Sequence, residues 1–190
     1  QMITTLVLAR LLLPGDFGLV SIALVIINSL ALLRDMGMSQ ALIYRRSDIE
    51  IAADTAFFIL PAAGLFLAVI AFLAAPALSS FFNVADSQSI IRVQALSLVL
   101  SSFGLVPVAL LERELSFRRR FLPEIIPVVG YAAAAIAAAA AGLGVWSLVA
   151  GELSRSFLLA TAIWPFSPWQ PHFRFSKAIA LELLVYGRHI

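Results

Sequence analysis

Glu152 and Arg155 are the residues whose type and spacing point most directly to chemistry in this sequence. They are the two charged side chains in the stretch 144–164, GVWSLVAGELSRSFLLATAIW. A spacing of i, i+3 puts both on one face of a helix, where they can pair. The other residues of the stretch are mostly apolar, as in a membrane span. A charged side chain near the centre of a membrane costs about 2.5–3.5 kcal/mol on insertion scales, so such residues usually face the interior of a helix bundle or a water-filled cavity. The pair is therefore either a structural ion pair that only stabilises the fold, which we call a clasp, or part of the lining of a pathway through the membrane.

Two further arginines lie at the ends of apolar segments. Arg10 precedes Leu13 and Pro14, and it either snorkels to the outer membrane interface or lines a cavity. Arg34 lies just before Asp35 and Gly37. It either caps the carboxyl end of a helix, where the helix dipole favours a cation, or lies at a cytoplasmic gate.

Enzyme motifs are absent from the sequence. There are no cysteines, and two histidines, His172 and His189, cannot form a metal cluster alone. There is also no glycine-rich phosphate loop and no H-E-x-x-H or G-x-S-x-G motif. We therefore expect no metal, no cofactor and no enzymatic activity.

The composition places the chain in a membrane. Its residues are 62% hydrophobic and 13% charged, whereas a soluble domain is roughly 45–50% apolar. The ranges 55–85 and 125–151 carry no charged side chain, and about 20 apolar residues suffice for a helix to cross about 30 Å of hydrocarbon. At least these two segments are expected to span the bilayer.

The distribution of lysine and arginine predicts the number of spans. Basic residues concentrate in 34–54, 112–120 and 172–190, and the positive-inside rule makes these three regions cytoplasmic. The third region, 172–190, can lie on the cytoplasmic side only if residues 121–165 cross the membrane twice. The predicted fold is therefore an all-α, polytopic bundle of six transmembrane helices in residues 1–171, with approximate spans at 1–13, 17–34, 55–82, 93–111, 121–141 and 145–165.

The ends of the chain and one basic loop carry further expectations. The first apolar stretch, 2–13, would rise only about 18 Å, so we expect its helix to lack its start. Residues 172–190 are predicted to form a cytoplasmic amphipathic segment that lies on the membrane. The basic loop LERELSFRRR (111–120) is expected to contact anionic phospholipid. Docking of a lipid diphosphate on this loop is the alternative. Its arginines are Arg113, Arg118, Arg119 and Arg120.

Four blocks of sequence resemble the bacterial polysaccharide exporters. They are LARLLLPGDFGLVSIALVI (8–26), DMGMSQALIYRR (35–46), GLVPVALLERELSFRRR (104–120) and GLGVWSLVAGELSRSFLLATAIWPFSPWQPHFRFS (142–176). They occur in the same order as in that family and cover nearly the whole chain. The family is the polysaccharide transporter branch of the multidrug/oligosaccharidyl-lipid/polysaccharide exporter superfamily, which includes O-antigen and colanic-acid-type flippases.

The resemblance implies a transporter with two lobes of six helices, of which this chain is the amino-terminal one. It implies alternating access and transfer of an undecaprenyl-diphosphate-linked oligosaccharide across the bacterial inner membrane, for lipopolysaccharide, capsule or exopolysaccharide synthesis. Polysaccharide assembly proteins are implied as partners, and nucleic acid is not. A cationic central cavity is also implied. Because Arg155 lies near the middle of its predicted span, we expect it to contact the anionic headgroup. The candidate substrate-binding residues are Arg155, Glu152, Arg10 and Arg34.

Other functions remain as alternatives. A cation-coupled drug or small-molecule antiporter of the same superfamily needs an acidic residue within a span, and Glu152 is the candidate. A non-transporting membrane scaffold would recruit partners through LERELSFRRR. A membrane-embedded glycan polymerase or ligase is disfavoured, because the outward loops predicted at 14–16, 83–92 and 142–144 are short.

Overall fold

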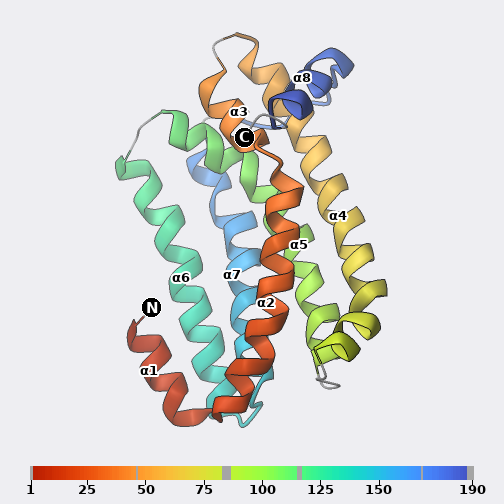
Figure 1. The fold of residues 1–190 in the computed structure, drawn as a ribbon. Helices are drawn as coiled ribbons and strands as arrows, with labels where there is room; N and C mark the ends of the chain where they lie inside the picture. The colour runs from red at the N-terminus through yellow and green to blue at the C-terminus, as the bar shows by residue number, and fades with distance from the viewer. Residues whose placement is uncertain (1, 46, 83–86, 115–116, 168, 188–190) are drawn as a thin grey trace.

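The computed structural model describes the chain except for residues 1, 46, 83–86, 115–116, 168 and 188–190 (Figure 1). Within the described residues every regular element is helical, which confirms the all-α prediction. The elements are α1 (Met2–Leu11), α2 (Pro14–Asp35), α3 (Met38–Tyr44), α4 (Ile49–Phe81), α5 (Ser87–Arg113), α6 (Phe117–Ala140), α7 (Trp146–Ala162), the 3-10 turn η1 (Trp164–Phe166) and α8 (Lys177–Gly187).

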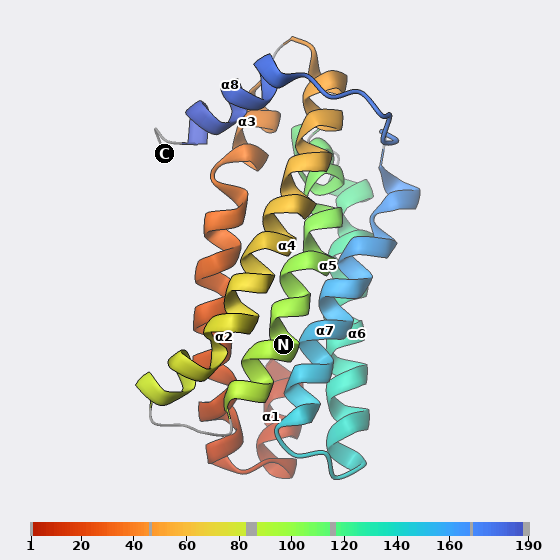
Figure 2. The ribbon, with the colours of Figure 1, turned by 90° about the vertical axis from the view of Figure 1, so that its right-hand side faces the viewer.

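The long helices run up and down beside one another, and the short ones gather at one end (Figures 1 and 2). The α2–α4 connection, the α5–α6 junction and the segment after α7 all lie at the end that carries α3 and α8. We call it the basic end, because the three predicted basic regions meet there. The other junctions lie at the opposite end, which agrees with the predicted sidedness.

Four helical segments are long and apolar enough to cross a membrane: α2, α4, α5 and residues Pro123–Ala140 of α6. The chain is therefore a multi-pass membrane protein. α1 has 10 residues and α7 has 17, so at 1.5 Å per residue they are about 15 and 26 Å long. The count of six spans stays a prediction.

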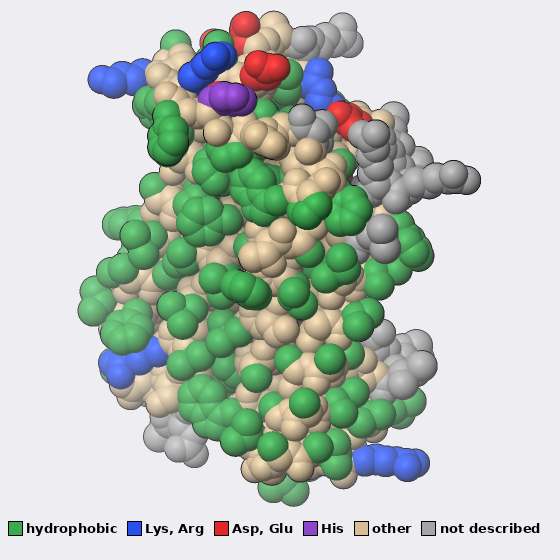
Figure 3. All heavy atoms as spheres, turned by 180° about the vertical axis from the view of Figure 1, so that it is seen from behind, with side chains coloured by type: hydrophobic (Ala, Val, Ile, Leu, Met, Phe, Trp, Pro, Cys, Tyr) green, Lys and Arg blue, Asp and Glu red, His purple; other side chains and the backbone are tan. Residues whose placement is uncertain are grey.

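The outer surface has the polarity that a bilayer requires. Hydrophobic side chains cover the middle of the face in Figure 3, and most of the charged ones lie toward its ends. Along α4, large apolar side chains such as Phe66 and Leu73 are exposed. Exposed apolar groups of this size are expected where lipid replaces water as the solvent.

The structure differs from the predicted spans in where several helices begin and in one additional helix. α4 begins at Ile49 rather than near 55, so that its first turns extend beyond the apolar run and include Asp54. α3 was not predicted, because only the turn before it leaves a sequence signal. At that turn Met36 and Gly37 both have positive φ, 42° and 72°, and the left-handed conformation ends α2 and redirects the chain.

The start of α2 follows its sequence signals. Pro14 occupies the first helical position, where its missing N–H leaves no hydrogen bond unmade. The carboxylate of Asp16 accepts a hydrogen bond from the Leu13 backbone N–H at 3.1 Å, as in a capping box.

Close helix contacts occur where side chains are small. α6 packs along α7 and α4 packs along α5. On the α6 side Ala135 and Ala139 are buried, so the alanine run of α6 provides a packing face. On α4, a Cβ at Gly64 would lie 2.9 Å from the Leu98 carbonyl oxygen of α5, so only glycine permits this approach.

Candidate functional site

A cavity of about 240 Å³ lies among α1, α6 and α7. It is lined by Thr5 of α1, Val128 and Tyr131 of α6, and Glu152 and Arg155 of α7. Arg155 is about 14 Å along α7 from Trp146, so the charged pair lies near the middle of this helix. The cavity therefore brings polar groups of three helices together beside the middle of α7.

The charged pair in this cavity is loosely held. Nη1 of Arg155 lies 3.9 Å from Oε1 of Glu152, and the side chains are 47% and 20% exposed, respectively. A separation of 3.9 Å exceeds hydrogen-bond length. The pair therefore interacts through charge and does not form the two parallel hydrogen bonds of a bidentate guanidinium–carboxylate pair, the fork geometry. The lining therefore carries one negative formal charge, on Glu152, and one positive formal charge, on Arg155, and these balance.

Tyr131 is positioned by a glycine of the facing helix. A Cβ at Gly151 would lie 2.9 Å from Cε2 and 3.0 Å from Cδ2 of the Tyr131 ring, and 3.0 Å from Cβ of Ala135. The ring therefore lies directly against the backbone of α7. The hydroxyl of Ser154 donates to the Gly130 carbonyl at 3.4 Å across the same interface.

Gly151→Ala is expected to displace the Tyr131 ring and to separate α6 from α7. Overpacking of this kind costs about 1–3 kcal/mol, so the detergent-solubilised full-length protein should unfold at a lower temperature. Gly18→Ala is the matched control, because nothing lies within 4 Å of a Cβ at that helical position and alanine favours a helix. Equal melting temperatures for the two variants would contradict the proposed contact.

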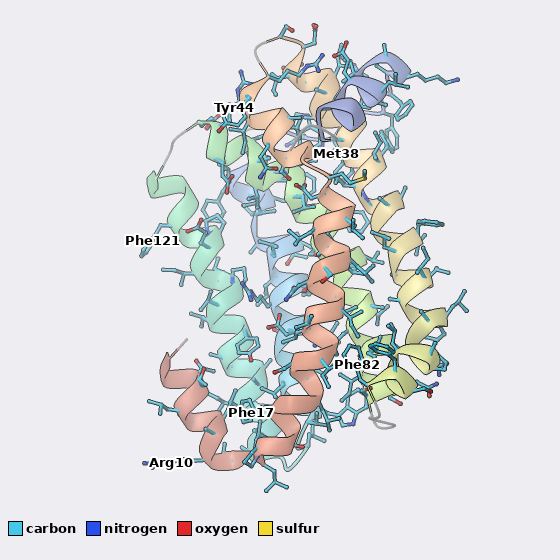
Figure 4. The ribbon with its side chains drawn as sticks, in the orientation of Figure 1. Arg10, Phe17, Met38, Tyr44, Phe82 and Phe121 are labelled. Atoms are coloured by element: carbon cyan, nitrogen blue, oxygen red, sulfur yellow. The ribbon has the colours of Figure 1, made fainter. Side chains whose placement is uncertain are left out.

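The structure does not bring Arg10 or Arg34 into this cavity. Arg10 is exposed and points away from the bundle at the end opposite the basic end (Figure 4), as snorkelling predicts. Arg34 is 5% exposed, and its Nη1 donates to the Leu98 carbonyl at 2.5 Å and to the Ser101 hydroxyl at 2.7 Å.

Arg34 lies in the last turn of α2, as expected, but its side chain bonds to α5 and not to the carbonyl groups at the end of α2. A role at a cytoplasmic gate stays a prediction. The physical reason is the space beside Gly64. A Cβ there would lie 3.3 Å from Cδ of Arg34, so the glycine makes room for the arginine stem between α2, α4 and α5.

The basic loop is described only in part. Arg113 donates to the backbone carbonyls of Leu42 and Arg45, so its guanidinium ties α5 to the end of α3. The side chains of Arg118, Arg119 and Arg120 lie outside the described part of the chain. Contact of this loop with anionic phospholipid stays a prediction.

Sequence reasoning missed a buried carboxylate at the basic end. Asp54 of α4 is 1% exposed. Its Oδ1 accepts hydrogen bonds from the indole N–H of Trp169 at 3.1 Å and from the His172 backbone N–H at 3.0 Å. Thr55 accepts one from the Ser176 backbone N–H at 3.2 Å. The one available signal was an acidic residue directly before the uncharged run that begins at position 55.

The chain after α7 packs back onto the basic end. Trp169 is 8% exposed and packs with Phe57 and Trp164. The helix α8 was expected to lie on the membrane. Instead its Leu183 is buried against the basic-end core, and its Glu182 pairs with Arg45 after α3 at 3.0 Å, because α3 and α4 offer an apolar surface there.

Comparison with known proteins places the chain among polysaccharide biosynthesis proteins. A family model described as "Polysaccharide biosynthesis protein" matches residues 7–190. The chain is 27% identical over 189 residues to "Succinoglycan biosynthesis transport protein ExoT" of Rhizobium meliloti (strain 1021), covering 98% of this chain and 38% of that protein. It is 28% identical over 113 residues to "Lipopolysaccharide biosynthesis protein WzxC" of Escherichia coli (strain K12), covering 60% of this chain and 23% of that protein.

No solved structure matches the chain significantly. The chain spans less than half the length of the two relatives.

Proposed function

Because this chain belongs to the polysaccharide biosynthesis protein family, we propose that the protein exports a lipid-linked oligosaccharide across the bacterial inner membrane. The proposed substrate is an undecaprenyl-diphosphate-linked oligosaccharide for cell-surface polysaccharide synthesis. The chain acts as the amino-terminal lobe of an alternating-access transporter and not as an enzyme. Its cavity between α1, α6 and α7 contacts the substrate during transfer.

The observation that carries this proposal is the cavity that holds Glu152 and Arg155 near the middle of α7. A pair that served only as a clasp would gain most by closing to hydrogen-bond distance, yet the two groups stay 3.9 Å apart. The Arg155 side chain is nearly half exposed. In the described part of the chain neither charged side chain makes a hydrogen bond, so both remain available to a bound molecule.

The name of one relative supports the assignment to transport. The succinoglycan protein is called a transport protein, and its similarity covers 98% of this chain. The similarity to the lipopolysaccharide biosynthesis protein, over a shorter range, supports the same class of surface glycan. Four helical segments of membrane length support a protein that works within a bilayer.

The test is complementation of a bacterial strain that lacks its own exporter, with the full-length protein at matched membrane levels. Arg155→Ala is expected to lower surface polysaccharide at least about tenfold, since a hydrogen bond to a charged group contributes about 1.5–3 kcal/mol. Arg155→Lys should retain part of the activity, because it keeps the charge but not the fork. Arg10→Gln is the matched control, because it removes an arginine that points away from the bundle.

The double variant Glu152→Gln/Arg155→Gln separates a pathway from a clasp. If the cavity contacts substrate, this variant loses export although its two neutral amides can still pair. Wild-type surface polysaccharide from the double variant would instead assign the pair to folding alone.

A further inference from the structure

We infer that the cavity between α1, α6 and α7 binds a sugar residue of the substrate, and not its diphosphate. This inference rests on the proposed function and names the part of the substrate that the site recognises. It revises the expectation that Arg155 contacts the anionic headgroup. Three features of the lining carry it: the charge balance, the mixture of donors and acceptors, and the placement of the Tyr131 ring.

The charge balance disfavours a diphosphate. Glu152 lines the same cavity as Arg155, with 3.9 Å between their charged atoms. A phosphate within reach of the guanidinium would also lie beside this carboxylate, and like charges placed together disfavour binding. A neutral group can approach both side chains without that repulsion.

The hydrogen-bonding groups fit hydroxyls better than phosphate. The Glu152 carboxylate only accepts hydrogen bonds, the Arg155 guanidinium only donates them, and the Tyr131 phenol does both. A sugar hydroxyl both donates and accepts, so neighbouring hydroxyls can satisfy the carboxylate and the guanidinium together. A phosphate oxygen without a proton only accepts, and it would leave Glu152 without a donor.

Tyr131 supplies an apolar surface beside the two charged groups. One edge of its ring lies against the α7 backbone at Gly151, and Val128, also on α6, adds an aliphatic wall to the same cavity. An aromatic side chain combines an apolar body with a polar end, and a sugar ring offers the matching combination of C–H faces and a hydroxyl rim. The volume of about 240 Å³ is below the range of about 300–1,000 Å³ typical of drug-sized ligands, which fits one sugar residue better than a whole oligosaccharide.

Binding of two lipids to the full-length protein in nanodiscs tests the inference. One probe is undecaprenyl diphosphate without sugar, and the other is undecaprenyl diphosphate that carries the oligosaccharide. Glu152→Gln and Tyr131→Leu are each expected to weaken binding of the glycosylated lipid about fivefold or more, and to leave binding of the bare lipid within twofold of wild type. Tyr131→Phe keeps the ring and should lose less than Tyr131→Leu. Arg10→Gln is the control for general charge loss.

The sign of the Glu152→Gln effect decides between sugar and diphosphate. A diphosphate at this site would bind more tightly once the neighbouring carboxylate is neutralised, so stronger binding of both lipids would overturn the inference. An equal loss of both lipids in Arg155→Gln would also overturn it. In either case the proposed function stands. If wild-type protein binds neither lipid above empty nanodiscs, the proposed function fails, and the sugar site with it. Melting temperatures of the variants exclude unfolding as the cause of a loss.

Discussion

Asp54→Ala is expected to release residues 169–176 from the basic end and to cost about 3 kcal/mol of stability. The carboxylate is buried and accepts hydrogen bonds from the Trp169 indole and the His172 backbone. Each bond to a charged acceptor contributes about 1.5–3 kcal/mol, and a buried donor that loses its acceptor carries a desolvation cost. The Trp169 N–H is such a donor, because its side chain is buried among Phe57 and Trp164.

Limited chymotrypsin digestion of the full-length protein measures this release. Cleavage after Trp169 should be slow in the wild type and faster in Asp54→Ala, with a lower melting temperature for the variant. Asp54→Asn is the matched control, because its amide oxygen can still accept from both donors while the volume is unchanged. If the alanine and asparagine variants are cleaved and melt alike, these hydrogen bonds do not hold the segment.

The long helices were predictable because a bilayer imposes a single strong requirement. An apolar run of about 20 residues has few alternatives to a helix once it enters hydrocarbon, and the uncharged run that begins at position 55 lies within α4 for most of its length. The start of α4 was not predictable in the same way. Its first turns lie at the basic end beyond the apolar run, and Asp48 before them makes no side-chain capping hydrogen bond, so no local signal marks the boundary.

The candidate site was predictable only in its local part. Glu152 and Arg155 belong to one helix, and their spacing of three residues fixes their common face. Tyr131 and Thr5 come from other helices, and the sequence does not say that α1 and α6 pack around this part of α7. The tie between Asp54 and Trp169 joins residues 115 positions apart, so it depends on how α4 meets the segment after α7.

Arg34 shows how a local signal can mislead. A basic residue in the last turn of a helix is a reasonable cap, and Arg34 occupies that place in α2. Because Gly64 has no side chain, there is space for the Arg34 stem between α2, α4 and α5, and its guanidinium reaches Leu98 and Ser101 of α5. The side chain of Asp35 is engaged elsewhere, accepting a hydrogen bond from the Ser39 hydroxyl at 2.5 Å.

The second prediction with a large effect concerns this buried arginine. Arg34→Ala is expected to cost about 3 kcal/mol or more, because it removes a buried stem and leaves a cavity between three helices. Arg34→Met should cost much less, since it keeps an unbranched stem and avoids burying a charge. Arg34→Lys should resemble the alanine variant, because a compact ammonium keeps the desolvation cost and loses the planar fork.

The methionine variant is expected to be tolerated because the former partners of Arg34 keep other hydrogen bonds. The Ser101 hydroxyl still donates to the Ser97 carbonyl at 2.6 Å, and Leu98 belongs to the interior of α5. Nε of Arg34 has no acceptor within the described residues, so the wild-type guanidinium is only partly satisfied. Melting temperatures of the three full-length variants in detergent measure the order. If Arg34→Met melts at as low a temperature as Arg34→Ala, the hydrogen bonds to α5 contribute more to stability than the packing of the stem. If Arg34→Met melts near wild type, stability does not require the charge.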